Sequence, residues 1–205
     1  FCFLKELQDE GLIKHLGVTN FDAAHLRIAL ASGIPIVSNQ VCHSLIDQRA
    51  NATMADVCRE YNVKLLTFGT LAGGFLTDKW LGKVEPTYEE LTTWSQMKYK
   101  RFIDAAGGWE PYQNLLKTVK EVADKHTASI ANISSRFILE NEAVASVIVG
   151  ARLGESEHID DNRRMLDIQL DTEDINAIKQ AQLQLKMNPG DCGDEYRKPP
   201  FLTAS

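Results

Sequence analysis

Residues 64–74 read KLLTFGTLAGG, a short apolar run that ends in a glycine-rich turn. A strand buried on both faces of a parallel sheet is typically an unbroken apolar run. Clustered glycines mark a turn rather than a continuing strand. The stretch therefore predicts a buried strand over residues 64–68 that delivers the chain into a tight turn at its carboxyl end.

Similar units occur on both sides of this stretch. Apolar runs predict three more strands at residues 15–20, 34–42 and 146–151. Between and after them, apolar residues recur at helical spacing, which predicts helices. The last two predicted helices cover about residues 155–165 and 174–186. Asp171 or Thr172 is the predicted cap of the second one. Strands that alternate with helices imply a parallel sheet, either doubly wound or closed into a barrel. A complete (β/α)8 barrel needs about 250 residues, so four units in 205 residues predict half a barrel or a small open sheet.

A long excursion follows the third strand, from Thr77 to Trp109. It holds three tryptophans and little sustained periodicity, and a long excursion at a strand end is typical of a functional loop. Its tryptophans are candidate walls of a substrate pocket. Beyond Pro189 the sequence predicts an irregular tail.

Composition excludes several classes of partner and site. The 28 acidic and 22 basic residues give a net charge of -6, which disfavours binding to nucleic acid or anionic membranes. The four cysteines show no CxxC pair, so neither a zinc site nor a disulfide framework is indicated. No apolar run is long enough to span a bilayer. We expect a cytoplasmic protein, with an organelle left open because the chain opens at Phe1 without its N-terminus.

Polar residues collect where the predicted strands end, which is where parallel β/α folds place their sites. Asn20 and Gln40 each carry an amide that can donate to and accept from a carboxamide, and Phe68 offers a ring for stacking. Together with the glycine-rich turn, they fit a flat amide-bearing ring and a phosphate. Singly, each has a structural alternative: Asn20 as a helix cap, Gln40 as a satisfied core amide, and Phe68 as core.

Three segments resemble the aldo-keto reductase family. GVTNF at residues 17–21 is similar to the family signature GVSNF, and LAGGFLT at 71–77 to PLAGGFLTG. VGAR at 149–152, followed by EHIDDN at 157–162, is similar to the late GAR…EQLEEN segment. The resemblance implies the C-terminal half of a (β/α)8 barrel, with residues 1–188 as a partial domain whose N-terminal half is absent and 189–205 as the tail. It departs at Gly69-Thr70, where the family has Ser-Pro, and in the late segment, which is two residues longer between Arg152 and Glu157.

The resemblance also implies a cofactor site for NADP. The nicotinamide carboxamide is expected to meet Thr19, Asn20 and Gln40, with Phe68 stacked on the ring. The pyrophosphate is expected beside the turn that holds Gly69, Leu71 and Gly73. The 2′-phosphate is expected at Arg152, and the adenine at Glu157 and Asn162. NADP is favoured over NAD because of Arg152, whose planar fork suits a phosphate.

The implied activity is hydride transfer between NADPH and a small aldehyde or ketone. The family's catalytic aspartate, tyrosine, lysine and histidine come from the N-terminal half, so we expect no catalytic residue in this chain and no turnover by it alone. A non-catalytic NADP-binding module with a regulatory or sensing role is the alternative. Half a barrel exposes two sheet edges, which predicts self-association.

Overall fold

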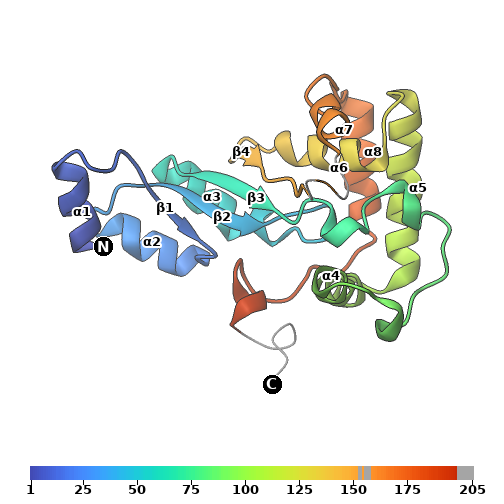
Figure 1. The fold of residues 1–205 in the computed structure, drawn as a ribbon, viewed down its shortest axis with the longest axis horizontal. Coiled ribbons are helices and arrows are strands. Elements are labelled where there is room, and N and C mark those ends of the chain that lie inside the picture. The colour runs from blue at the N-terminus through green and yellow to red at the C-terminus, as the bar shows by residue number, and fades with distance from the viewer. Residues whose placement is uncertain (152–153, 155–157, 198–205) are drawn as a thin grey trace.

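The computed structural model describes residues 1–151, 154 and 158–197. Its centre is a parallel sheet of four strands in the order β1-β2-β3-β4 (Figure 1). The strands are β1 (Leu16–Thr19), β2 (Ile36–Cys42), β3 (Lys64–Phe68) and β4 (Val144–Val147). Each pairs with the next along the chain, which is how successive strands of a barrel are arranged. The predicted α/β fold of a partial barrel is confirmed.

Helices and short 3-10 turns occupy the connections. The α-helices are α1 (Cys2–Asp9), α2 (Ala23–Ala31), α3 (Thr53–Tyr61), α4 (Trp94–Ala105), α5 (Trp109–Lys125), α6 (Ile130–Leu139), α7 (Ile159–Arg164) and α8 (Thr172–Gln182). The 3-10 turns are η1 (Arg49–Asn51), η2 (Ala72–Gly74), η3 (Asp78–Trp80), η4 (Tyr88–Glu90) and η5 (Asp194–Tyr196). None of the helices in the described ranges has the length and apolar character needed to cross a membrane.

The two faces of the sheet differ in burial. Val41, Leu65 and Thr67 point to the side covered by helices and are fully buried. The alternate residues Gln40 and Phe68 are only half-buried. They point to the side that would be the inside of a closed barrel, where side chains of the remaining strands would cover them. α2 packs on α3, and α5 packs between α6 and α8. The half-covered face is therefore the one that can present a site.

The long excursion after β3 is more ordered than its sequence pattern suggested, because it contains α4. Thr93 caps this helix by accepting from the Gln96 N–H at 3.1 Å. Tyr99, Phe102 and Ile103 form its buried face, and this spacing places them on one side of a helix. Their packing against the sheet turn outweighs the mixed polar sequence around them.

Residues 190–197, here called the C-terminal strap, have little regular structure beyond η5 but are packed onto the molecule. Cys192 and Glu195 are buried. The strap, red in Figure 1, lies beside the ends of β1 and β2. Arg49 donates to the Asp191 carbonyl at 2.8 Å, so the strap is joined to the loop after β2. The sequence indicated an irregular segment but not this packing.

Candidate functional site

Thr19, Asn20 and Gln40 lie together at the carboxyl ends of β1 and β2. Thr19 is paired with Gln40 in the sheet register. The Asn20 N–H donates to the Gln40 carbonyl at 2.8 Å, and the Asn20 side-chain amide donates to the Thr19 hydroxyl at 3.0 Å. These three residues are called the amide corner below.

Asn20 has two features that distinguish it from a structural asparagine. Its backbone is left-handed, with φ of 56°, a conformation that asparagine adopts more readily than most residues. Its side-chain oxygen Oδ1 is buried and accepts no hydrogen bond from any residue in the described ranges. The cap of α2 is Asp22, which accepts from the His25 N–H at 2.8 Å. Asn20 is thus not the cap of α2.

Gln40 is likewise not the core amide of its strand. That position belongs to its neighbour Asn39, which is fully buried and donates to the Phe21 carbonyl at 2.9 Å. Because side chains alternate across a strand, Gln40 points to the half-covered face. Its amide can therefore reach a ligand that lies on the sheet.

Phe68 ends β3 on the same face as Gln40. Cys42 and Phe68 are paired in the register of β2 and β3, so the ring lies next to the amide corner across one strand. The ammonium nitrogen of Lys98, from α4, lies 5.3 Å from the Phe68 ring centroid, within cation–π range. Lys98 is a site neighbour that sequence analysis missed.

The turn after β3 needs its glycines because Tyr99 packs against them. Gly69 has φ of 70°, and a Cβ there would overlap the Tyr99 hydroxyl. At Gly73, with φ of 64°, a Cβ would lie 2.9 Å from the Tyr99 ring. Other residues are strained at such angles and would also displace the tyrosine. The turn and α4 are therefore one packed unit.

A cleft of about 750 Å³ runs between this turn, the start of α4 and the chain after β4. Its walls include the predicted Gly69, Leu71 and Gly73, together with Lys79, Ser95 and Gln96 from the excursion and Val149, Gly150 and His158 from the segment after β4. Lys79 and His158 add basic groups that suit an anion. Backbone N–H groups in a tight glycine turn suit phosphate oxygens as well.

The predicted adenosine end is only partly described. Arg152 and Glu157 lie outside the described residues. Asn162 lies on α7 and its N–H donates to the His158 carbonyl at 2.7 Å, so it sits one helical turn beyond the cleft wall. Of the ten predicted cofactor residues, Asn162 is the described one that stands apart from both the amide corner and the cleft.

Burial sets the protonation of the groups beneath the site. It raises the pKa of Tyr99 and of the Cys42 thiol well above their ordinary values, so both stay neutral. Burial lowers the pKa of His43, whose Nδ1 lies 3.0 Å from the Asp47 carbonyl. His43 lines a separate cavity between α3, α6 and α8, away from the cleft.

Comparison with known proteins identifies the family. The model of the aldo/keto reductase family matches residues 1–182. This chain belongs to the aldo/keto reductase family. Members of the family are oxidoreductases that generally use a nicotinamide dinucleotide.

Relatives of this aldo-keto reductase chain are moderately similar in sequence. It is 30% identical over 130 residues to flagellar radial spoke protein 5 of Chlamydomonas reinhardtii, covering 62% of this chain and 24% of that protein. It is 28% identical to protein tas of Escherichia coli, covering 91% and 52%. An NADH-specific methylglyoxal reductase of the same bacterium is 24% identical, covering 86% and 51%. The chain thus spans about half the length of most of these relatives.

Solved structures agree on the fold. A glycerol dehydrogenase from Gluconobacter oxydans superposes with a TM-score of 0.71 at 20% identity, covering 98% of this chain and 56% of that one. A thermostable aldo-keto reductase in complex with the inhibitor epalrestat gives a TM-score of 0.62 at 21% identity, covering 88% and 53%. At these identities the likeness concerns the barrel fold alone.

Proposed function

We propose that the full-length protein is an NADP-dependent aldo-keto reductase and that residues 1–197 supply most of its cofactor site. The amide corner carries the proposal: Thr19, Asn20 and Gln40 lie together, and a buried acceptor on Asn20 has no hydrogen-bond partner among the described residues. A buried acceptor left without a hydrogen bond costs about 1–3 kcal/mol. A carboxamide N–H would satisfy it.

The residues present fit a nicotinamide dinucleotide along the whole half-covered face. Asn20 and Gln40 would hold the carboxamide, and Phe68 would support the ring by stacking. The turn from Gly69 to Gly73 would face the pyrophosphate across the cleft. When bound, NADPH supplies the hydride that reduces an aldehyde or ketone. The protein residues described here orient that cofactor; the family's proton-donating tyrosine and its partners are expected in the part of the barrel that this chain does not include.

Turnover is the direct test. We expect the full-length protein to consume NADPH with members of an aldehyde and ketone panel. The loss of NADPH absorbance measures this consumption. Residues 1–205 alone should bind the cofactor without turnover, since proton transfer typically contributes 10²–10⁴-fold and its donor would be missing. A folded full-length protein that carries the four catalytic residues and shows no turnover would contradict the proposal.

The second candidate is a non-catalytic NADP-binding module. It is favoured by one observation, the similarity to a protein named for the flagellar radial spoke. The two candidates differ in the sequence before Phe1. An aspartate, tyrosine, lysine and histidine at strand ends there would support the reductase, and their absence from the full gene would support the module.

The preference for NADP rests on Arg152, and one relative is NADH-specific, so it needs its own test. In the full-length protein, Arg152→Ala should weaken NADPH binding by about 1.5–3 kcal/mol, the range for a hydrogen bond to a charged group. NADH binding should change little, because NADH lacks the 2′-phosphate. Fluorescence titration of both cofactors measures this, and equal losses would remove the role from Arg152.

A further inference from the structure

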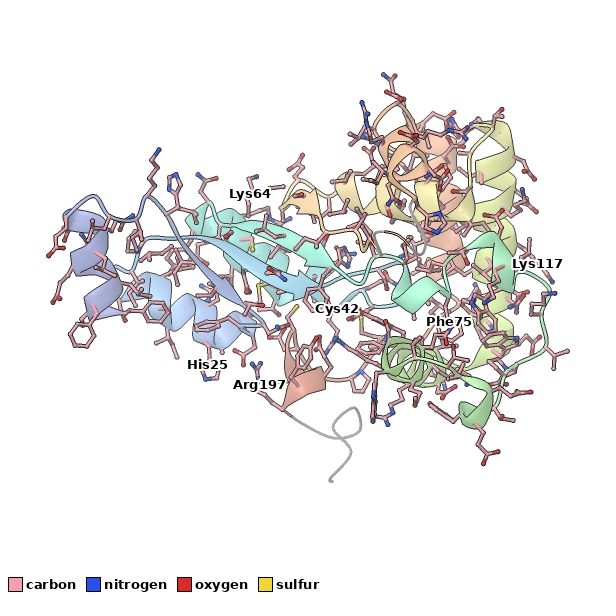
Figure 2. All side chains as sticks on the ribbon, viewed as in Figure 1. His25, Cys42, Lys64, Phe75, Lys117 and Arg197 are labelled. Atoms are coloured by element: carbon pink, nitrogen blue, oxygen red, sulfur yellow. The ribbon has the colours of Figure 1, made fainter. Side chains whose placement is uncertain are left out.

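The C-terminal strap contacts the turn that holds Asn20. Arg197 Nη1 donates to the Asn20 carbonyl at 2.7 Å. Gly193, with φ of 81°, lies so close that a Cβ would overlap the same carbonyl oxygen. Figure 2 shows Arg197 on the strap next to the start of α2, where its Nη2 lies 3.5 Å from Asp22. Two strap residues, Gly193 and Arg197, therefore contact the backbone carbonyl of Asn20.

This contact bears on the backbone conformation of Asn20. Asn20 sits in the left-handed region, which few residues other than glycine and asparagine adopt readily. Its N–H is fixed by the Gln40 carbonyl and its C=O by Arg197. The backbone of Asn20 is therefore restrained on both sides, at its N–H and at its C=O. The strap supplies one of these two restraints.

The strap is itself anchored by a buried ionic cluster. Arg49 donates to Asp47 Oδ2 at 2.7 Å and to Glu195 Oε2 at 2.9 Å, and all three side chains are almost fully buried. A fork of N–H donors that holds two carboxylates is geometrically demanding. The strap position is thereby tied to the loop that follows β2, the strand that carries Gln40.

The strap also reaches the stacking ring. Tyr196 accepts a hydrogen bond from Lys98 at 2.7 Å, and the Lys98 nitrogen lies over the Tyr196 ring at 4.3 Å and the Phe68 ring at 5.3 Å. The strap thus contacts the backbone of Asn20 directly and reaches the ring of Phe68 through Lys98.

From this geometry we infer that Gly193 and Arg197 are positioning residues for the carboxamide contact of Asn20. The inference rests on the proposed cofactor site. It predicts that the strap acts on the nicotinamide half of the cofactor and leaves the adenosine half unaffected, because the cleft that would hold the pyrophosphate has no strap residue in its wall.

The test compares two ligands in the full-length protein. One is NADP⁺; the other is 2′-phospho-ADP-ribose, which lacks the nicotinamide ring. For Arg197→Ala we expect about a tenfold loss of NADP⁺ affinity, as removal of one hydrogen bond of about 1.4 kcal/mol would produce. The affinity for 2′-phospho-ADP-ribose should stay unchanged. Gly193→Ala should show the same selectivity with a larger loss, and Arg197→Lys should recover part of the affinity.

The matched control is Lys64→Ala. Lys64 also donates to a backbone carbonyl, that of Glu142 at 2.9 Å, but lies at the amino end of β3, opposite the site (Figure 2). It should leave both affinities unchanged. Equal losses of the two ligands in the strap variants, or no loss of either, would overturn the inference. A wild-type protein that binds neither ligand would overturn the proposed function and the inference with it.

Discussion

At the scale of single residues, Asn20 combines a conformation and a chemical group that can be separated by substitution. Asn20→Gly keeps the left-handed backbone, because glycine adopts it freely, and removes only the amide. We expect NADP⁺ affinity to fall by about tenfold or more, the effect of losing one or two hydrogen bonds. Titration calorimetry on the full-length protein measures the affinity.

Asn20→Ala serves as the comparison, since alanine adds strain of about 1–2 kcal/mol at this backbone angle. Thermal unfolding should show Asn20→Ala less stable than Asn20→Gly, while both bind NADP⁺ weakly. If Asn20→Gly bound as tightly as the wild type, the amide of Asn20 would have no part in the site.

The roles of neighbouring amides show what sequence can and cannot assign. Asn39 and Gln40 are both polar and adjacent, and the alternation of a strand sends one to each face. Which face is covered depends on helices elsewhere in the chain, so pattern alone left Gln40 open as a core amide. The structure assigns the core to Asn39. The cap of α2 is likewise Asp22 rather than Asn20.

At the scale of elements, the Arg49 cluster joins the loop after β2 to the strap. Arg49→Met would leave the buried carboxylates of Asp47 and Glu195 without their cation. Breaking a buried ion pair from one side costs about 3–5 kcal/mol, and we expect a loss of that size in the free energy of unfolding from urea titration.

Arg27→Met is the matched control for that measurement. Arg27 pairs with Glu60 at 2.6 Å, but both side chains are nearly half exposed. Surface pairs of this kind contribute about 0–1 kcal/mol. Similar losses of unfolding free energy in the two variants would show that burial does not determine how much the Arg49 cluster contributes to stability.

The start of α8 makes stability depend on acid pH. A hydrogen bond from Lys125 and the N–H of Asp174 hold the pKa of Asp171 at about 2, below its ordinary value. Because the folded-state pKa is depressed, the unfolded chain binds the proton more readily. The stabilisation is therefore complete above about pH 4 and is lost as pH falls toward 2.

Asp171→Asn tests this dependence, because asparagine caps a helix about as well as aspartate but does not titrate. Thermal midpoints recorded from pH 5 to pH 2 should fall less steeply for the variant than for the wild type. Parallel curves would mean that other carboxylates account for the acid sensitivity of the protein.

Elements with local signals were predictable, and elements that depend on distant contacts were not. The four strands and the helices around them follow from apolar runs and caps, with ends displaced by a few residues: β4 begins at Val144 rather than at Ser146. α4 went unpredicted because its buried face packs on a turn about thirty residues earlier. The packing of the strap could not be predicted from sequence either, because Arg49 and Glu195 are far apart along the chain.

At the scale of the whole molecule, β1 and β4 are the two edge strands of the described sheet, and each is paired on one side only. Each therefore presents unpaired N–H and C=O groups, and apolar residues such as Val37 and Ile148 are about 40% exposed, at 42% and 41%. Exposed strand edges promote pairing with other chains. We expect residues 1–205 expressed alone to self-associate, measured by size-exclusion chromatography with light scattering.

The full-length protein is the comparison, because closing the barrel abolishes both edges. It should elute without edge-mediated oligomers under the same conditions. A stable monomer of residues 1–205 at micromolar concentration, with cooperative unfolding, would show that the chain protects its own edges.

The bond from Arg197 to Asn20 joins residues 177 positions apart, and this separation bears on the order of folding. Closing so long a loop carries an entropy cost that local helices and adjacent strands avoid. During synthesis, β1 and β2 are complete long before the ribosome reaches the strap. In refolding experiments, circular dichroism should therefore report the sheet and helices before NADP⁺ binding recovers. The strap, translated 177 residues after Asn20, would then be the segment that makes the end of β1 competent to hold its ligand.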